Sequence, residues 1–426
     1  MMAGPQSALR RTLEIAVSVC VLAGCSAASQ QPTGADWAEY RGDVARDGHP
    51  STATLTAAAA PSLTRVWTAH LDGAVDGTPA VSGAAVVVGT SAGTLYALDR
   101  SSGMTIWAKH GLGAISSSPT IAGDGVYVTT LTGHALAYGL GRGNLRWDWS
   151  GAKDWAIWAS PVVYRDEVIV GVASPYGDQP LVAGRIYALD VTHGLVRWTF
   201  CLRADCTPGD GVWSTAAIDP SGTAFVGVGN PDDEVLAFDA LTGKRIWASA
   251  LYFDGGRDLD VGASPIVSKL GGRESIWQAT VEGSFAILDA ASGAIRQSRR
   301  LVAGSAVHGL LATPGYDGKS FYVPSASPPT GLFGIAAASG ATLWQHDTNL
   351  PVYSAPAAGA GVVVFGTGNV FGDTNTGSLV ALSTADGRVL WTYDAHSAVR
   401  SGPALAGDLM VVGDVAGDVM AFSPKH

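Results

Sequence analysis

The sequence predicts an all-β protein: an eight-bladed β-propeller of four-stranded antiparallel blades, closed by an N-terminal strand. A module that first appears complete between Thr78 and Trp107 returns at intervals of about forty to fifty residues, which is the period of propellers. Charged residues make up only 15% of the chain and 55 of its 426 residues are glycine, which favours short strands joined by tight turns. Each module contains two alternating apolar runs bounded by Gly-rich turns, as strands require.

The first residues are typical of an export signal rather than of a blade. Arg10 and Arg11 precede a short apolar run, residues 15–23, which is too short to span a bilayer. The run leads into Leu-Ala-Gly-Cys25, which resembles the lipobox of bacterial lipoproteins, in which the cysteine is acylated and becomes the mature N-terminus. The alternative is an ordinary cleaved signal in which the cysteine is incidental.

The lipobox resemblance divides the chain into three parts. It implies a lipoprotein signal peptide over residues 1–25 with lipidation at Cys25, a flexible tether over residues 26–35, and a single propeller over residues 36–426. We therefore expect an exported protein that faces the periplasm or the cell surface and touches the membrane only through its lipid anchor. The formal net charge of −10 argues against nucleic acid as a partner, because binding a phosphate backbone needs a basic surface.

Two of the four cysteines, Cys201 and Cys206, remain for the folded part of the chain. An exported chain is in an oxidising compartment, so we expect these two to form a local disulfide. No histidine falls between them, which argues against a metal site in this loop.

Two landmarks of the module give the number of copies. The first is a small residue followed by proline, and the second is a strand that resembles Ala-Leu-Asp. The first landmark falls at Pro79, Pro119, Pro161, Ala216 (proline replaced), Pro265, Pro314, Pro356 and Pro403. The second falls at Leu98, Tyr138, Leu189, Phe238, Leu288, Ile335, Leu382 and Phe422. Both series give eight copies.

The eighth copy ends at Phe422, before a tryptophan-bearing strand of its own. The segment Leu63–Trp67 stands before the first module and belongs to no copy. Pairing it with the last copy would close the ring and leave no open sheet edge, so we also expect a monomer. An open solenoid would need polar capping repeats, and neither end of the chain resembles one.

Within a copy, the motif Ala-x-Asp-x-x-x-Gly-x-x-x-Trp has a structural role. The glycine permits a tight turn, and the tryptophan fills the space between blades. The tryptophan position is occupied by Trp107, Trp147, Trp198, Trp247, Gln297, Trp344 and Trp391. The motif resembles the tryptophan-docking motif of PQQ-like (quinoprotein) propellers. The lead-in segment Asp36-Trp37, with Arg41 and Arg46, resembles the same superfamily.

The residues three positions before each proline landmark are expected to converge on the central channel, because the innermost strand of each blade lines it. They are Asp76, Ser116, Trp158, Trp213, Gly262, Leu311, Tyr353 and Arg400. Such a ring suits a planar or carboxylate-bearing ligand, which makes Trp158 and Arg400 candidate cofactor-binding residues. Aromatic residues at a propeller mouth also bind protein partners or sugars, so the ring alone leaves these alternatives open.

The fourth and fifth copies resemble PQQ-dependent alcohol dehydrogenases, with a form closest to the polyvinyl-alcohol dehydrogenase branch. Trp213-x-x-x-Ala-x-Asp-Pro is followed by Gly-Asn230-Pro and then by Asp258-Leu-Asp260 ahead of a proline-bearing strand. The resemblance implies that Trp213 stacks under the quinone, Asn230 binds Ca²⁺, and Asp258 is both the catalytic base and a ligand of the metal. Asp260 is assigned to the cofactor site and Asp178, in the third copy, to the metal.

The chain departs from the family pattern at three places. Asp178-Gln179 stands where the family has a calcium-binding glutamate. The basic residue for the quinone oxygens would fall near Val281-Glu282, where neither residue is basic, and the ring formed by adjacent cysteines is absent.

Besides sugar or polymer binding at the aromatic ring, which has only the composition of the ring behind it, two functions stay open. One is a dehydrogenase that uses PQQ and Ca²⁺ to oxidise a small-molecule alcohol and passes electrons to a separate carrier, because no haem Cys-x-x-Cys-His occurs. The other is a non-catalytic scaffold that docks an envelope protein, as in the outer-membrane barrel-assembly propeller lipoprotein, with the site residues inherited and unused.

Overall fold

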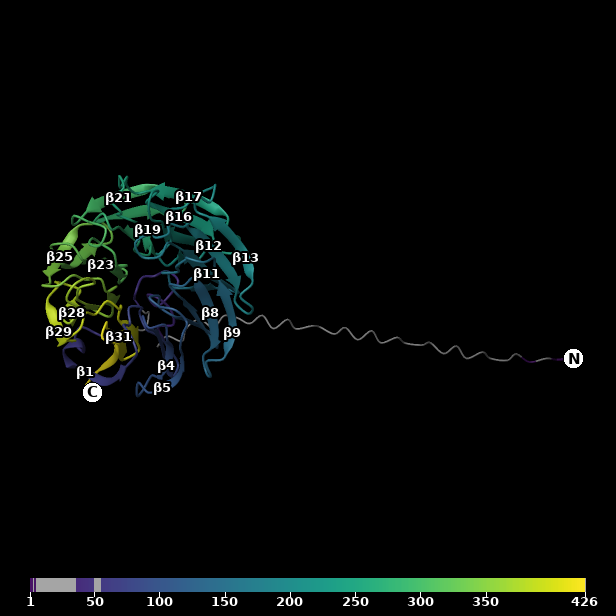
Figure 1. Cartoon of the computed structure of the whole chain (residues 1–426), viewed down its shortest axis with the longest axis horizontal. Helices are drawn as coiled ribbons and strands as arrows, with labels where there is room; N and C mark the ends of the chain where they lie inside the picture. Colours follow the sequence, from purple (N-terminus) through teal and green to yellow (C-terminus); the bar gives the residue numbers. More distant parts are fainter. Residues whose placement is uncertain (3, 5–35, 50–54, 426) are drawn as a thin grey trace.

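The structure, a computed structural model, describes residues 1, 2, 4, 36–49 and 55–425. Its strands form eight separate four-stranded sheets, each antiparallel. Figure 1 shows these sheets arranged as blades around a central axis. The predicted all-β, eight-bladed propeller is confirmed. The lipidation candidate Cys25 lies outside the described residues.

The strands follow the chain from the centre of each blade to its rim. Blade 1 has β2 (Ala80–Ser82), β3 (Ala85–Gly89), β4 (Leu95–Asp99) and β5 (Thr105–Lys109). Blade 2 has β6 (Thr120–Ala122), β7 (Gly125–Thr129), β8 (His134–Gly139) and β9 (Leu145–Ser150). Blade 3 has β10 (Val162–Tyr164), β11 (Glu167–Val172), β12 (Arg185–Asp190) and β13 (Val196–Cys201). Blade 4 has β14 (Ala217–Ile218), β15 (Thr223–Gly227), β16 (Glu234–Asp239) and β17 (Arg245–Ala250).

The second half of the ring repeats this order. Blade 5 has β18 (Ile266–Leu270), β19 (Arg273–Ala279), β20 (Ser284–Asp289) and β21 (Ile295–Arg300). Blade 6 has β22 (Gly315–Tyr316), β23 (Ser320–Ser325), β24 (Gly331–Ala336) and β25 (Thr342–Asp347). Blade 7 has β26 (Ala357–Ala358), β27 (Val362–Gly366), β28 (Ser378–Ser383) and β29 (Val389–Asp394). Blade 8 has β30 (Ala404–Ala406), β31 (Leu409–Gly413), β32 (Asp418–Pro424) and, at its rim, β1 (Leu63–His70), which follows the 3-10 helix η1 (Ala60–Ser62).

The ring is closed by the N-terminal strand. Strand β1 pairs antiparallel with β32, and Leu63 lies opposite Pro424 in this register. Both ends of the propeller chain therefore lie in one blade, as Figure 1 shows near the labels β1 and C. This pairing satisfies the backbone groups that an open edge would expose. The predicted closure is confirmed.

The tryptophans join each blade to the next. A Cβ atom at Gly103, where φ is +71°, would lie 2.6 Å from the Trp67 ring, so only glycine lets the two surfaces meet. The same contact recurs around the ring, for example between Trp107 and Gly143. In the fifth blade Gln297 takes the tryptophan position and donates a hydrogen bond to the Ser339 carbonyl at 3.2 Å.

A second connection between blades surrounds the channel. In five of the eight copies the hydroxyl residue directly before the landmark accepts a hydrogen bond from the backbone N–H of the equivalent residue in the preceding blade. The acceptors are Ser118, Ser160, Thr215, Ser264 and Thr313, at 2.8–3.0 Å. These bonds fix the innermost residues of the first six blades relative to one another, and so fix the channel ring.

The lead-in segment, residues 36–49, covers one end of the channel. Its backbone is hydrogen-bonded to the innermost strands of several blades, including Val81 of blade 1 and Ala358 of blade 7. The side chain of Arg46 is fully buried and donates hydrogen bonds to the Ala216 carbonyl and to Glu39. Because this segment occupies that end, the opposite face of the ring is where ligands can enter. No helix in residues 36–49 and 55–425 has the length and apolar character needed to cross a membrane.

Candidate functional site

The predicted channel ring lines one cavity of about 240 Å³. All eight ring positions contribute to its walls: Asp76, Ser116, Trp158, Trp213, Gly262, Leu311, Tyr353 and Arg400. Tyr40 of the lead-in segment also lines it and donates a hydrogen bond to the Thr313 hydroxyl at 3.0 Å. The spacing of the repeats was therefore sufficient to identify which side chains meet at the axis.

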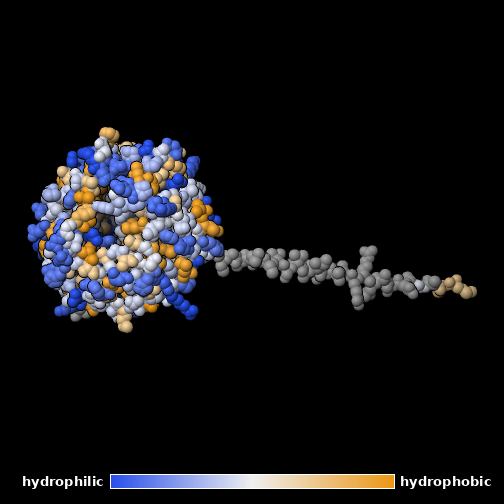
Figure 2. All heavy atoms as spheres, viewed as in Figure 1, coloured by the Kyte–Doolittle hydropathy of each residue, from blue (hydrophilic) through white to orange (hydrophobic). Residues whose placement is uncertain are grey.

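A larger cavity of about 680 Å³ adjoins the channel. Trp158, Trp213, Leu311 and Tyr353 line both spaces and so separate the channel from the larger cavity. Figure 2 shows a hollow near the middle of the propeller, with hydrophobic residues among those around it. The larger cavity brings together predicted site residues from three blades: Asp178, Trp213, Asn230, Asp258 and Asp260.

Trp213 is held in place by Asp260. The indole Nε1 of Trp213 donates a hydrogen bond to Asp260 Oδ2 at 3.0 Å, and the backbone N–H of Asn230 donates to Asp260 Oδ1 at 2.8 Å. A Cβ atom at Gly262 would lie 1.7 Å from the Trp213 ring. Glycine is therefore required at this position of blade 5 because the ring of blade 4 lies over it. Asp260 positions its neighbours with both carboxylate oxygens.

Asn230 and Asp258 form a second pair on the cavity wall. The amide Nδ2 of Asn230 donates a hydrogen bond to Asp258 Oδ1 at 3.0 Å. This bond directs the remaining amide oxygen, Asn230 Oδ1, which is buried and has no hydrogen-bond partner among the described residues. A buried acceptor without a donor is costly, so this oxygen is available to coordinate a cation.

This wall of the cavity carries several carboxyl groups close to one another. Burial raises the pKa of Asp258, and the nearby carboxylates of Asp178 and Asp254 raise it further. Burial also raises the pKa of Asp260 to about 6, against the hydrogen bond from Asn230 that lowers it. A negative charge on one of these carboxyl groups disfavours ionisation of its neighbours, so a bound cation would stabilise their charged forms.

The donor chemistry of this wall fits Ca²⁺. Asp178, Asn230 and Asp258 offer the carboxylate and amide oxygens that this ion prefers. Within residues 36–49 and 55–425, no three His, Cys, Asp or Glu side chains converge as a metal site. The protein ligands would therefore be two carboxylates and one amide, and the remaining positions would fall to a cofactor or water.

Arg400 lies in a different place from the other candidates. It lines the narrow channel and not the larger cavity, and its guanidinium is 2.7 Å from Asp76 in the neighbouring blade. Trp158 does line the larger cavity, and its Nε1 donates to the Ser174 carbonyl at 3.0 Å. Of the two ring residues predicted to bind a cofactor, only Trp158 lies beside Trp213.

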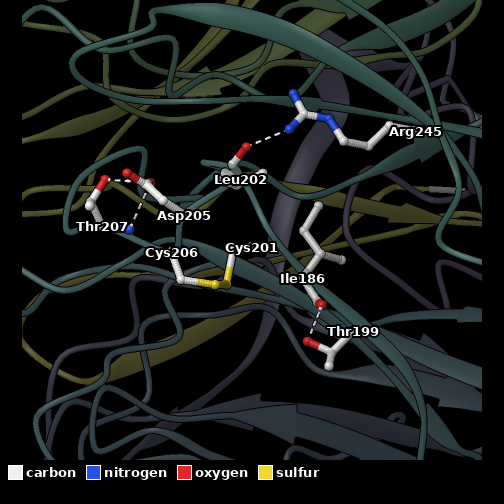
Figure 3. The surroundings of a disulfide bond; sticks show 8 residues. All are labelled: Ile186, Thr199, Cys201, Leu202, Asp205, Cys206, Thr207 and Arg245. Atoms are coloured by element: carbon white, nitrogen blue, oxygen red, sulfur yellow. Dashed lines mark hydrogen bonds between the residues drawn. A yellow bond between two sulfur atoms is a disulfide. The ribbon is translucent and has the colours of Figure 1, made fainter.

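Arg203 is a basic lining residue that the sequence did not single out. It lies between Cys201, the last residue of β13, and Cys206, and these two cysteines form a disulfide with Cα atoms 5.3 Å apart. Figure 3 shows this bond, with Asp205 accepting hydrogen bonds from Thr207 nearby. The disulfide therefore closes a short loop that carries Arg203 at the cavity.

Val281 and Glu282 stand where the resemblance would place a basic residue. Val281 lines the cavity, and Glu282 makes an ion pair with Arg300 at 3.1 Å. Asp210, a fully buried lining residue, adds a further carboxyl whose pKa burial and Asp232 raise to about 7. The position of Arg203 depends on the disulfide loop, and the sequence carried no repeat signal for it.

Comparison with a protein family gives a match along most of the chain. The family described as outer membrane protein assembly factor BamB matches residues 51–205, 149–333 and 332–426. These ranges together include every blade.

A curated relative matches part of the chain. It is a polyvinylalcohol dehydrogenase of Sphingopyxis sp. (strain 113P3), 30% identical over 185 residues. The match covers 42% of this chain and 23% of that protein, so the chain accounts for less than a quarter of the relative's length.

Solved structures share the fold at low sequence identity. The quinohemoprotein alcohol dehydrogenase of Comamonas testosteroni superposes with a TM-score of 0.80 at 18% identity, over 92% of this chain and 81% of that chain. BamB of Moraxella catarrhalis superposes with a TM-score of 0.65 at 16% identity, over 85% of this chain and 99% of that chain. At these identities the likeness shows the fold alone.

Proposed function

Since the chain belongs to the family of the outer membrane protein assembly factor BamB and has a quinoprotein-type fold, we propose that it is a Ca²⁺- and quinone-binding propeller that oxidises an alcohol. One observation carries this proposal. A single cavity of about 680 Å³ collects Trp213, Asn230 and Asp258, together with Asp178. A propeller used only as a scaffold has no need for a cavity with an unpartnered amide oxygen in its wall.

The residues present fit a planar aromatic cofactor in shape. The half-buried Trp213 ring lies between the channel and the larger cavity and is fixed by Asp260. An indole face of this kind stacks on a planar ring. PQQ is therefore proposed to lie against Trp213, with Trp158 beside it.

The charge of the cavity makes Ca²⁺ a condition for an anionic quinone. The lining contains the carboxyl groups of Asp178, Asp210, Asp258 and Asp260, and Arg203 is the basic residue in it. PQQ carries carboxylates, so the acidic wall repels it until a divalent cation is bound. Calcium binding should therefore precede and strengthen quinone binding.

The roles of the residues follow from their positions. When bound, PQQ would supply a two-electron acceptor, activated by Ca²⁺. Asp178, Asn230 and Asp258 would hold the cation, and Arg203 would bind a carboxylate of the cofactor. Asp258 would accept the hydroxyl proton of the alcohol as its C–H hydrogen leaves with two electrons. The product is the corresponding carbonyl compound.

The test is reconstitution of the mature protein. We expect Ca²⁺ to raise the melting temperature, PQQ to raise it further only when Ca²⁺ is present, and an artificial dye to be reduced when an alcohol is added. A ligand that binds only the folded state adds about 2.7 kcal/mol at one hundred times its dissociation constant. No shift at high PQQ and Ca²⁺ would reject the enzymatic function.

The second candidate is a scaffold that docks an envelope protein. The observation in its favour is the family match over all eight blades. In that case the intact protein, purified from envelope membranes with a mild detergent, would carry a stoichiometric partner and no alcohol-dependent activity. Recovery of the propeller without a bound partner protein would argue against the scaffold function.

We further propose that the protein is exported and anchored by a lipid on Cys25, with no other contact to the membrane. This rests on the lipobox resemblance of the sequence. Replacing Cys25 with serine should release the protein into the soluble fraction, and mass spectrometry of the wild type should detect acyl groups on its N-terminal peptide. An unmodified N-terminus would contradict the proposal.

A further inference from the structure

Two loops on the cavity side of the ring are longer than their counterparts. Between the second and third strands of blade 3 the loop covers residues 173–184, and in blade 7 it covers residues 367–377. The equivalent loops of the other blades cover residues 90–94, 130–133, 228–233, 280–283, 326–330 and 414–417. Blades 3 and 7 are opposite each other in a ring of eight, so these two loops face each other across the mouth.

Both long loops carry an aromatic residue, a glycine and an aspartate in sequence. They are Tyr176-Gly177-Asp178 and Phe371-Gly372-Asp373. Each glycine has a left-handed backbone, with φ of +76° and +81°, so the chain turns directly after each aromatic residue. The opposed blades therefore present equivalent aromatic side chains from equivalent turns.

The two rings meet. The centroids of Tyr176 and Phe371 are 6.3 Å apart, with 40° between the ring planes, and both side chains line the cavity of about 680 Å³. They nevertheless remain 70% and 47% exposed, respectively. An aromatic pair in water shifts an open–closed equilibrium by only roughly two- to tenfold, so the contact can open readily.

The cavity below this pair has two unlike sides. The acidic groups and Asn230 come from blades 3 to 5. The side reached from blades 6 and 7 is mainly apolar and includes Ala306, Val307, Leu311 and Val370, together with Tyr353, whose hydroxyl donates a hydrogen bond to the Val307 carbonyl at 2.9 Å. A ligand whose polar group reaches Asp258 must therefore direct the rest of its body toward the apolar side and the two rings.

We propose that Tyr176 and Phe371 form an aromatic gate that selects alcohols whose hydroxyl group is attached to an apolar body. The gate rests on the proposed dehydrogenase function for its substrate class. Each buried methylene group favours binding about fourfold, so a gate that covers even part of an alkyl chain discriminates strongly against small alcohols. The rings also cover the cavity against water while the ligand is bound.

The first experiment measures the gate without any turnover. Nile red, a neutral apolar dye, is titrated into the wild type, the double variant Tyr176→Ala/Phe371→Ala, and the control Phe253→Ala. Phe253 is 86% exposed and does not line the cavity, so it matches the change in surface without touching the gate. We expect about a tenfold loss of affinity in the double variant alone. Equal affinities in all three proteins would overturn the gate.

The second experiment uses the protein loaded with Ca²⁺ and PQQ. The ratio of kcat/KM for 1-hexanol to that for ethanol should fall at least tenfold in the double variant and stay at the wild-type value in Phe253→Ala. An unchanged ratio in an active enzyme would overturn the gate and leave the dehydrogenase in place. If the wild type oxidises no alcohol while Nile red affinity still depends on the two rings, the dehydrogenase falls and the gate remains, for an apolar ligand of another kind.

Discussion

Blades 1 and 4 are copies of the same four-stranded repeat, but they differ in whether the polar side chains of the loop after the second strand have hydrogen-bond partners. In blade 1 the polar side chain of Thr90, in the loop after β3, is satisfied within the protein, since it donates a hydrogen bond at 2.8 Å to Asp72 in the segment that precedes β2. In blade 4 the corresponding loop, residues 228–233, leaves Asn230 Oδ1 and both carboxylate oxygens of Asp233 buried without a hydrogen-bond partner among the described residues. In blade 4 the unpartnered oxygen of Asn230 belongs to a residue that lines the larger cavity, and this agrees with a ligand site there.

The largest difference between a variant of the proposed site and a variant of the frame is expected from Asp258→Asn. This change keeps the size of the side chain and removes the proton acceptor, so dye reduction should fall about a thousandfold. Quinone affinity should persist, and steady-state kinetics with equilibrium titration of PQQ measure the two effects separately. Loss of quinone binding together with activity would show that activity fails because the cofactor is lost, and would contradict the role of Asp258 as the base.

The opposite behaviour is expected when a tryptophan of the frame is removed. Trp107 is buried, packs on Gly143 and donates to the Leu140 carbonyl at 2.7 Å. Trp107→Ala should cost about 3–5 kcal/mol in the free energy of unfolding, measured in urea, with quinone affinity retained.

Trp213→Ala is the matched comparison. Its half-buried ring faces the cavity, so this variant should unfold closer to the wild-type urea concentration and lose the stabilisation by PQQ. If both tryptophan variants lost stability equally and both kept the ligand, the distinction between frame and site would fail.

A smaller effect is expected from Asn230→Ala. The variant removes the unpartnered oxygen and the donor to Asp258, so the rise in melting temperature with Ca²⁺ should largely disappear. At one hundred times the dissociation constant this stabilisation is about 2.7 kcal/mol in the wild type. Calorimetry with and without Ca²⁺ measures it, and Thr90→Ala in blade 1 should leave the calcium shift intact.

The smallest effect concerns pH. Burial, with neighbouring carboxylates, raises the pKa of Asp210 and of Asp233 to about 7 in the folded protein. Between about pH 4 and pH 7 the folded state then holds more protons than the unfolded chain, so stability falls as the pH rises through this window. Without Ca²⁺, the melting temperature should be a few degrees higher at pH 5 than at pH 7.5. Equal melting temperatures at the two pH values would indicate that other titrating groups offset the effect of Asp210 and Asp233.

The number of blades, their closure and the docking of tryptophan on glycine could be predicted because they depend on local spacing. A period of forty to fifty residues fixes which residues occupy equivalent positions, and the eight residues of the channel ring followed from that alone. Trp213, Asn230 and Asp258 were grouped instead by the resemblance to PQQ-dependent alcohol dehydrogenases, and they come from the fourth and fifth copies of the repeat.

Only the tertiary structure could place Arg400 beside Asp76 in the narrow channel, Arg203 at the cavity and Tyr176 against Phe371. These contacts join residues far apart in the chain, and their distances depend on the curvature of the closed ring and on the lengths of two irregular loops. Equivalent positions in a repeat share a sequence signal, whereas opposed blades meet only after the ring has closed. The sequence therefore determined the ring, and closure of the ring decided which side chains face each other across its mouth.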